Sequence, residues 1–405
     1  MTSTRPRWSR SVVGITTLAL AIIPIAAASA ADGSDSRLAP LLAVGTPDAI
    51  AGEYIVVLDR GAAGDSVDRV AASAVAAGGT VSVTYRAVIK GFAATLSAEA
   101  LAVVRANPQV AFVEADGVVT ADVEPSDEQP DPPWGLDRID QRDLPLDQTY
   151  EYDWTGAGAT AYIIDTGMRI THEEFEGRAS YGYDMVDDDE VAEDCHGHGT
   201  HVGGTVGGKT YGVAKEVDLV AMRVLNCSGR GNWSRIIAAV DWVVINRDGP
   251  AVANLSLGGP SRHVFDMAIH NAVRAGLPVI VSAGNASIDA CLQSPARAPR
   301  AITVAATGQS DARASFSNFG PCVDLFAPGV GVLSAGIGSD TATATLSGTS
   351  MSTPHVVGVA ALYFEQNPDA TPKQVRRHIV LQSSMDKVID PGVDSPNRLL
   401  YSKIS

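Results

Sequence analysis

Five short apolar runs, separated by helical segments, occupy the second part of this 405-residue chain. The runs are residues 160–165, 218–225, 251–257, 277–283 and 301–306. Continuous apolar strands of this kind are buried on both faces, as in a parallel sheet covered by helices. Between two of them, apolar residues of segment 234–246 recur at helical spacing, among them Ile236, Val240 and Val243. The pattern predicts an α/β domain with a mostly parallel sheet flanked by helices.

The first part of the chain shows a different order of elements. Residues 53–59, 80–89, 91–96 and 111–116 have strand patterns, whereas residues 66–77 and a segment that starts at Ser97 have helix patterns. This β-α-β-β-α-β order predicts a small α+β unit of the ferredoxin-like type. Residues 32–51 and the proline-rich residues 121–133 are expected to be linkers, the second of them exposed to cleavage.

The N-terminus has the pattern of a secretory signal peptide. Three arginines, at positions 5, 7 and 10, precede an apolar stretch over residues 12–27, and Ala28-Ser29-Ala30 follows as a cleavage motif. Polar residues and a proline interrupt the stretch, which is also short for a membrane span. We expect cleavage after Ala30 and a secreted product that has no membrane attachment.

Composition narrows the classes of partner. Hydrophobic residues make up 45% of the chain and charged residues 19%, which excludes a disordered chain. Residues 121–405 hold 36 acidic and 21 basic side chains, so nucleic acid is disfavoured as a partner on electrostatic grounds. An exported chain with four cysteines is expected to form disulfides, and three pairings are possible.

Three segments carry the residue types of a hydrolytic site. Asp165 ends an apolar run before Gly167, His198 lies in GHGTH, and Ser350 lies in GTSMSTP. A serine hydroxyl becomes a nucleophile when a histidine takes its proton and a carboxylate orients that histidine. Ser350 is expected at the start of a buried helix, where a backbone N–H can face an oxyanion, and Asn285 is the candidate second donor.

Three other functional interpretations of the sequence have less support. Residues 203–210 fit the G-x-x-x-x-G-K-[ST] nucleotide loop, but the required strand does not precede them. His196, His198 and His201 have the spacing of a zinc site, yet no second set of ligands follows. An inactive secreted binding protein on the same fold is the third alternative, and the intact set of four residues argues against it.

The ordered motifs WGLDRIDQRDLPL, YIIDTG, DCHGHGTHVGGT, ANLSLGG, SAGN, SPAR and GTSMSTPHVVGVAALY make the chain similar to subtilases of the proteinase K and aqualysin branch. The resemblance implies a subtilisin-like fold, broad hydrolysis of polypeptides without a catalytic cofactor, and a monomer. Asp165 would be the orienting acid, His198 the base and acid, Ser350 the nucleophile and Asn285 the oxyanion donor. The first unit resembles the inhibitory propeptide of such peptidases, so we divide the chain into residues 1–30, 31–125 and 126–405.

The same resemblance implies further sites. Substrate would lie as an extra strand between two segments, residues 229–231 on one side and Ser256, Leu257 and Gly258 on the other. In the first segment, Gly229 and Gly231 would contact the substrate backbone. The main pocket for a substrate side chain would be lined by Ser282, Ala283 and Gly284. The propeptide would end in this groove, around residues 118–120. The cysteine pairs would be Cys195–Cys227 and Cys291–Cys322. Calcium would be bound by Pro299, Ala301 and Asp324 at one site, and by Asp137, Asp140, Gln141 and Asp147 at another.

Several residues depart from the family pattern. Ser352 replaces the usual alanine beside the nucleophile, Ser282 adds a hydroxyl to the pocket, and His196 stands where asparagine is common. Arg230 adds a charge at the rim of the groove, which predicts better cleavage of substrates with an acidic residue a few positions upstream. Activity is expected to fall below about pH 6.5, when a catalytic histidine becomes protonated.

Overall fold

The computed structural model describes residues 38–121, 124–125 and 133–403. The proposed signal peptide, residues 1–30, and most of the predicted cleavage segment lie outside these residues. No helix in the described part of the chain is long and apolar enough to cross a membrane. The elements of the N-terminal unit are β1 (Leu41–Leu42), β2 (Ala49–Leu58), α1 (Ser66–Ala76), β3 (Thr80–Tyr85), β4 (Gly91–Thr95), α2 (Ala98–Arg105) and β5 (Val110–Ala121).

The C-terminal domain follows with many short elements. Its helices are α3 (Trp134–Ile139), α4 (His198–Gly207), α5 (Trp233–Asn246), α6 (His263–Arg274), α7 (Thr349–Gln366) and α8 (Pro372–Gln382), with 3-10 turns at Glu173–Phe175 and Ala290–Leu292. Its strands are β6 (Glu124–Pro125), β7 (Thr160–Asp165), β8 (Ala179–Asp184), β9 (Asp218–Arg223), β10 (Arg230–Asn232), β11 (Ala251–Leu255), β12 (Leu257–Pro260), β13 (Val279–Ser282), β14 (Gln293–Ser294), β15 (Ile302–Thr307), β16 (Leu325–Pro328), β17 (Val332–Ala335), β18 (Thr343–Ser347), β19 (Ser384–Met385) and β20 (Arg398–Leu399).

A nine-stranded sheet forms the centre of the C-terminal domain, in the order β19-β20-β16-β15-β13-β11-β7-β9-β8. Its pairs are parallel except for β19–β20, so the predicted mostly parallel α/β sheet is confirmed. The five apolar runs became β7, β9, β11 with β12, β13 and β15. Strand side chains alternate between the two faces, and both faces are apolar because helices cover both.

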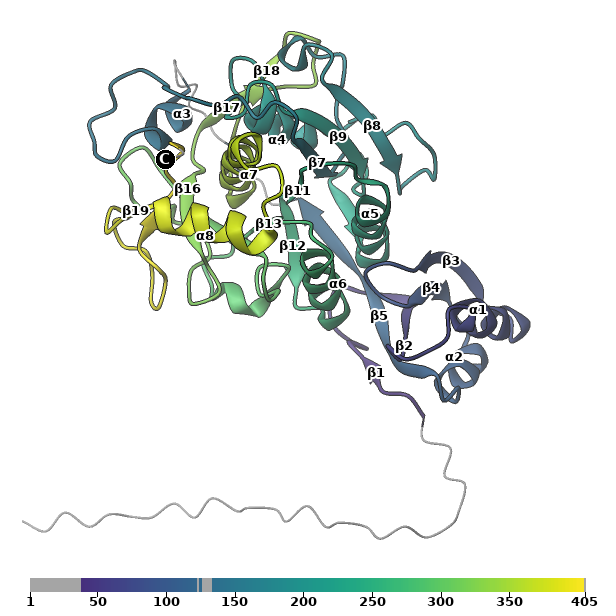
Figure 1. Ribbon diagram of the computed structural model, residues 1–405. Coiled ribbons are helices and arrows are strands. Elements are labelled where there is room, and N and C mark those ends of the chain that lie inside the picture. Colours follow the sequence, from purple (N-terminus) through teal and green to yellow (C-terminus); the bar gives the residue numbers. More distant parts are fainter. Residues whose placement is uncertain (1–37, 122–123, 126–132, 404–405) are drawn as a thin grey trace, which may run out of the picture. The chain divides into compact units, whose positions relative to one another are not determined.

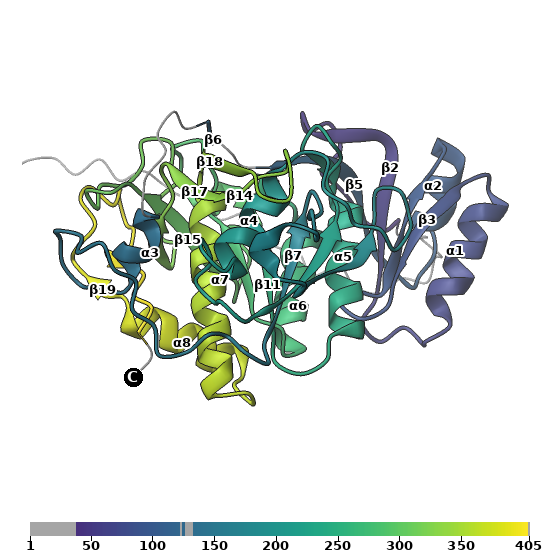
Figure 2. The same ribbon diagram turned by 90° about the horizontal axis from the view of Figure 1, so that it is seen from above.

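Each face of this sheet has its own core. Ile163 packs with residues of α4 and α7 on one face, whereas the next residue, Ile164, packs with residues of α5 and α6 on the other. Burying one such side chain contributes about 1.5–3 kcal/mol. Figures 1 and 2 show α7 crossing one side of the sheet and α5 with α6 on the other.

The N-terminal unit has the predicted β-α-β-β-α-β order, and its strands are arranged β5-β2-β4-β3 in antiparallel pairs. Its α1 and α2 pack on one face of this sheet in a separate core. The other face meets α5 and α6, because Ile55, Val57 and Tyr85 belong to the same cluster as Ile236 and Val240. The unit therefore shares one core with the C-terminal domain.

Two predictions about this part were wrong. Residues 32–51 were expected to be a linker, but β1 pairs with β5, and β2 begins at Ala49. The last strand was expected over residues 111–116, but β5 extends over Val110–Ala121. Its second half pairs with β10 and β12 of the C-terminal domain, which supply partners that the isolated segment does not reveal. Part of the proposed linker 121–133, β6, also pairs with β18.

Candidate active site

Asp165 is the last residue of β7, and the sharp turn after it sets its position. Gly167 has a positive φ of 98°, and a Cβ there would lie 2.5 Å from the carbonyl oxygen of Ala192. Glycine meets both requirements without strain. Within this turn, the N–H of Thr166 donates to Asp165 Oδ1 over 2.7 Å and holds the carboxylate at the strand end.

His198 is the first residue of α4 and lies beside this carboxylate. Its Nδ1 is 2.7 Å from Asp165 Oδ1, and both side chains are fully buried. A Cβ on Gly199 would lie 2.1 Å from the carbonyl oxygen of Gly167. Gly199 therefore allows α4 to approach the turn after β7 closely, and His198 is buried.

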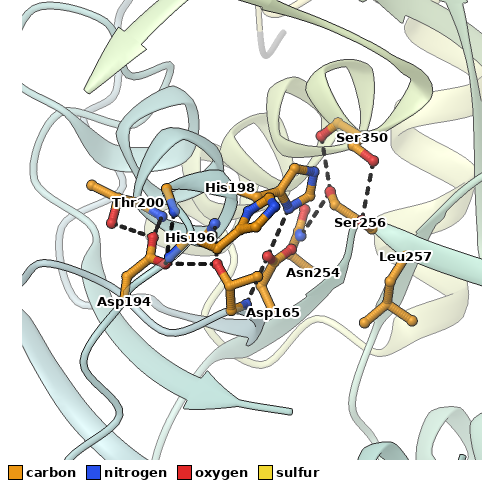
Figure 3. Close-up of polar contacts among 12 residues, drawn as sticks. Asp165, Asp194, His196, His198, Thr200, Asn254, Ser256, Leu257 and Ser350 are labelled. Carbon is orange, nitrogen blue, oxygen red and sulfur yellow. Dashed lines mark hydrogen bonds and ion pairs between the residues drawn. The ribbon is translucent and has the colours of Figure 1, made fainter. Parts of the chain in front are cut away.

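Ser350 is the second residue of α7, and its side chain lies on the same side of the sheet end as His198 (Figure 3). Its Oγ donates to the carbonyl oxygen of Ser256 over 3.1 Å, and Ser256 Oγ donates to the carbonyl oxygen of Ser350 over 2.9 Å. Asn254 Nδ2 donates to Ser256 Oγ over 3.0 Å. Figure 3 shows the His198 ring between Asp165 and Ser350. The ends of β7, α4 and α7 therefore bring the three predicted side chains together.

Asn285 follows β13 and has one end of its amide fixed. Its Oδ1 accepts from the N–H of Thr349 over 2.9 Å and from Thr349 Oγ1 over 2.8 Å. Its Nδ2 is buried and has no hydrogen-bond partner among the described residues. The first N–H groups of α7 also have no intrahelical acceptor. An amide donor and a helix N-terminus next to a serine are the parts of an oxyanion site.

Strand β5 of the N-terminal unit fills a groove beside Ser350. It pairs antiparallel with β10, through Val119 with Gly231, and with β12, through Ala121 with Leu257 and Thr120 with Gly258. An extended chain thus lies between the two predicted walls. Gly229 is not part of the wall, because it lies in the turn before β10 with φ of 67°. The predicted wall 229–231 is therefore shifted by one residue, to Arg230–Asn232.

The predicted pocket residues lie at the end of β13, next to β12. Ser282 Oγ donates to the carbonyl oxygen of Leu257 over 3.4 Å, and the carbonyl oxygen of Ala283 accepts from Asn318 Nδ2 over 2.7 Å. Gly284 has a φ of 97°, and a Cβ there would lie 2.1 Å from Gln293 Oε1. Sequence analysis missed Gln293 and Asn318, which support this segment from distant parts of the chain.

Asp194 was also missed, although it organises the loop before His198. Its two carboxylate oxygens accept five hydrogen bonds of 2.6–2.9 Å, from the N–H groups of His196, Gly197 and Thr200 and from the hydroxyls of Thr166 and Thr200. Figure 3 shows Asp194 on the side of α4 away from Ser350. An aspartate just before a predicted helix start is the signal that could have identified it.

Both disulfides form as the resemblance implied. Cys195 pairs with Cys227, and Cys291 pairs with Cys322. The first bond ties the loop before His198 to the turn before β10. The second ties the turn after β13 to the segment before β16. The first bond therefore connects the turn next to β10, one wall of the groove, to the loop that precedes His198.

The carboxylates of one implied calcium site have incomplete partners. Asp137 accepts from the N–H of Asp147 and of Gln148, and Asp140 Oδ2 accepts from the N–H of Glu151 over 2.6 Å. Asp140 Oδ1 is buried without a hydrogen-bond partner among the described residues. Burial raises the pKa of Asp140 to about 6, and the charges of Asp147 and Asp137 act in the same direction. This excess of negative charge fits a cation with oxygen ligands.

The other implied calcium site fits less well. Asp324 Oδ2 accepts from the N–H of Thr303 over 2.9 Å, and Oδ1 forms an ion pair with Arg376. Because Arg376 already neutralises Asp324, this carboxylate has no uncompensated charge to offer. Among residues 38–121, 124–125 and 133–403 there is no group of three or more His, Cys, Asp or Glu side chains arranged to hold a metal ion.

The two rival motifs do not form their sites. His201 Nε2 lies 2.9 Å from the carbonyl oxygen of Val332, and burial lowers the pKa of His201 to about 3. His198 turns to Asp165 instead, so the histidines do not converge on one point. Residues 203–210 include the C-terminal half of α4, whereas a nucleotide loop precedes a helix.

Comparison with known proteins agrees with this geometry. Residues 156–398 match the Subtilase family, and residues 53–122 match the peptidase inhibitor I9 family. The chain is 47% identical over 390 residues to an extracellular serine proteinase of Thermus sp. (strain Rt41A), which covers 91% of this chain and 94% of the relative. It is 52% identical over 316 residues to alkaline serine exoprotease A of Vibrio alginolyticus, covering 78% of this chain and 59% of that protein.

A solved structure gives the same assignment. The crystal structure of a cold adapted subtilisin-like serine proteinase matches with a TM-score of 0.66 and 52% identity. The match covers 67% of this chain and 98% of that structure.

Proposed function

Because the chain belongs to the subtilase family and is a secreted serine endopeptidase with an N-terminal inhibitor domain, we propose that Asp165, His198 and Ser350 cut polypeptides by acyl transfer. The observation that carries this proposal is the 2.7 Å contact between His198 Nδ1 and Asp165 Oδ1 beside Ser350. Asp165 fixes the tautomer of His198, so Nε2 is the nitrogen that can take the Ser350 proton.

The oxyanion formed in this reaction is stabilised by Asn285 Nδ2 and by the N-terminus of α7. Thr349 holds Asn285 Oδ1 through two hydrogen bonds, so Nδ2 keeps one direction before substrate binds. A donor that is oriented in advance costs no reorganisation in the transition state. When the tetrahedral intermediate collapses, the C–N bond breaks and His198 gives its proton to the leaving amine. Water then hydrolyses the acyl-enzyme, with His198 again acting as the base and returning the proton to Ser350.

Broad specificity follows from the way in which the groove holds a chain. Strand β5 contributes backbone pairs to β10 and β12, and such pairs form with any sequence. Ser282, Ala283 and Gly284 would bound the pocket for the residue before the cut. Arg230 lies opposite Thr120 and is exposed, which supports a preference for an acidic residue upstream. Comparing peptides with aspartate or asparagine upstream tests this preference, and equal rates in wild type would remove it.

The same groove supports self-processing. Ala121 is paired with Leu257, and Glu124 is paired with Ser347, three residues before the nucleophile. The bond that Ser350 attacks would therefore lie between Ala121 and Glu124, at the start of the proline-rich segment 121–133 that was expected to be exposed to cleavage. N-terminal sequencing of the mature enzyme tests this range, and a first residue beyond Glu124 would contradict it. The inhibitor unit then remains as a bound product.

Calcium is proposed as a structural ligand near Asp137, Asp140, Gln141 and Asp147, where it would neutralise the buried carboxylate of Asp140, although the side chains of the described residues are not arranged as a metal site before the ion binds. No step of the reaction requires a metal in this scheme. Labelling with a serine-directed phosphonate tests the proposed mechanism most simply. Loss of casein hydrolysis with label on Ser350 supports it, whereas resistance to the reagent together with rapid inactivation by a chelator would favour a metallohydrolase.

A further inference from the structure

A buried ion pair joins the start of the N-terminal unit to the peptidase. Arg262 Nη2 donates to Asp48 Oδ2 over 2.5 Å and to Thr46 Oγ1 over 2.9 Å. The side chain of Arg262 is 1% exposed and that of Asp48 is 10% exposed. Asp48 lies before residue 53, where the match to the inhibitor family begins. The contact is therefore additional to the strand that fills the groove.

The segment that carries Asp48, residues 38–48, is named the arm. It is attached to the same strand that enters the groove, because Leu41 pairs with Val113 and the carbonyl oxygen of Asp48 accepts from the N–H of Val118 over 2.9 Å. Arg262 follows β12, the other wall of the groove. The arm thus reaches from one edge of β5 to the peptidase.

Strand β5 leaves room for this contact at Gly117. A Cβ at that position would lie 2.6 Å from Asp48 Oδ2 and 2.7 Å from Arg262 Nη2. Trp233 Cδ1 would lie 2.9 Å away, so the ring limits movement of the strand. Any larger residue would push the two charged groups apart. The chain therefore has a glycine at the point where the ion pair crosses the strand.

One hydrogen bond connects the two charges. Asp48 Oδ1 and Arg262 Nε are buried and have no hydrogen-bond partner in the described part of the chain. Glu114 is a second carboxylate near Arg262, but burial raises the pKa of Glu114, and the positive charge of Arg262 only opposes that rise. Glu114 also uses its oxygens for the N–H groups of His263 and Val264. Removing the Asp48 charge would leave a buried guanidinium without its direct partner.

We propose that Arg262 is a carboxylate-binding site of the peptidase, outside the groove, and that Asp48 of the arm occupies it to retain the propeptide after the chain is cut. The inference rests on the proposed self-processing for its biological role. Cutting between Ala121 and Glu124 breaks the covalent link and leaves the ion pair intact. Release of the inhibitor then requires this contact to open.

The full-length chain and its Asp48→Asn variant test the proposal. The measured quantity is the rate at which cut propeptide leaves the enzyme, followed as the delay between cleavage on a gel and hydrolysis of a short peptide. Loss of a buried charge pair at an interface accelerates dissociation, and we expect about 30-fold or more. Asp65→Asn is the matched control, because Asp65 pairs with Arg69 on the exposed surface of the same unit. Equal release from wild type and Asp48→Asn would overturn the proposal.

A second measurement does not depend on self-cleavage. In the Ser350→Ala background, hydrogen exchange at the Val118 amide reports opening of the arm, because this N–H is bonded to the carbonyl oxygen of Asp48. We expect faster exchange in Asp48→Asn and no change in Asp65→Asn. If exchange is faster in Asp48→Asn but the wild-type chain is not cut, the result supports the ion pair and refutes self-processing. Unchanged exchange would refute the ion-pair role.

The Arg262→Gln variant distinguishes loss of the ion pair from a general loss of folding stability. If the two charges act through each other, Asp48→Asn combined with Arg262→Gln releases the propeptide no faster than the faster single variant. Rates that multiply would contradict the proposal. Unchanged hydrolysis of a short peptide by the released Arg262→Gln enzyme confirms that the peptidase is folded.

Discussion

The peptidase core and its contact with the N-terminal unit are stabilised in different ways. In the core, α4 and α7 pack apolar side chains on one face of the sheet, and the proposed catalytic groups lie at the ends of these packed elements. The contact with the N-terminal unit has an apolar centre, but carboxylates make many of its directional bonds. The first arrangement is permanent, whereas the second can be released.

Three carboxylates show the polar character of this contact. Glu114 and Asp116 of β5 accept from the N–H groups of Val264 and Ser234, at the first turns of α6 and α5. In the opposite direction, Asp241 of α5 accepts from the N–H groups of residues 86, 87 and 88. Burial raises the pKa of Glu114 and of Asp116. These bonds require the folded geometry of both partners, so an inhibitor that stays bound after self-processing is released when it unfolds.

The largest expected effect comes from the catalytic side of this comparison. Asn285→Ala removes the oriented Nδ2 while leaving Ser350 in place. In subtilisin, removal of the equivalent donor lowers kcat by about 10²–10³-fold, and we expect a similar loss here with little change in KM. Steady-state hydrolysis of a short peptide measures it. Asn246→Ala, at the exposed end of α5, serves as the control, and an equal loss in both variants would count against the oxyanion role.

Asp241→Asn tests the contact between the N-terminal unit and the peptidase, which can be released. The variant loses the charge that accepts three consecutive N–H groups, and we expect the propeptide to dissociate about 30-fold faster. Hydrolysis of a short peptide by the released enzyme should stay within about two-fold of wild type, because Asp241 lies on α5, away from Ser350. Asp218→Asn, an exposed aspartate on β9, is the matched control. A drop in activity without faster release would show that Asp241 supports the core instead.

Removing calcium tests whether a bound cation, in addition to apolar packing, stabilises the peptidase. If the calcium concentration is 100 times the dissociation constant of the site, adding a chelator lowers the free energy of unfolding by about 2.7 kcal/mol. The thermal midpoint of the Ser350→Ala chain, measured with calcium and with EGTA, reports this loss. Asp140→Asn should abolish the difference between the two conditions. A calcium effect that persists in this variant would place the ion elsewhere.

A smaller effect is expected from pH. Burial lowers the pKa of His355 to about 4, below its unfolded value of about 6.5, so the unfolded chain binds the extra proton between these values. The contribution of His355 to the free energy of unfolding is therefore complete above pH 6.5 and falls by about 1.4 kcal/mol per pH unit toward pH 4. Chemical unfolding of the Ser350→Ala chain at pH 7 and pH 5 measures it. His355→Gln should have a flatter pH dependence, and an unchanged slope would assign it to other groups.

The same contrast explains what the sequence could predict. Apolar runs such as residues 160–165 identify buried strands by local pattern, and the motifs around Asp165, His198 and Ser350 predict a triad. Arg262 and Asp48 are 214 positions apart, and nothing local indicates that they meet. Likewise, β5 was predicted too short because most of its second half, residues 118–121, pairs with β10 and β12. Contacts between units depend on shape and register, which the pattern of one segment does not contain.

The most direct test of the account is the intact mass of the wild-type chain and of Ser350→Ala, each produced at full length with calcium. We expect wild type to appear as two chains cut between Ala121 and Glu124, whereas Ser350→Ala remains in one piece. The N-terminal unit should still bind the cut wild-type enzyme in a freshly prepared sample. Identical trimming of both chains at this point would contradict self-processing by Ser350.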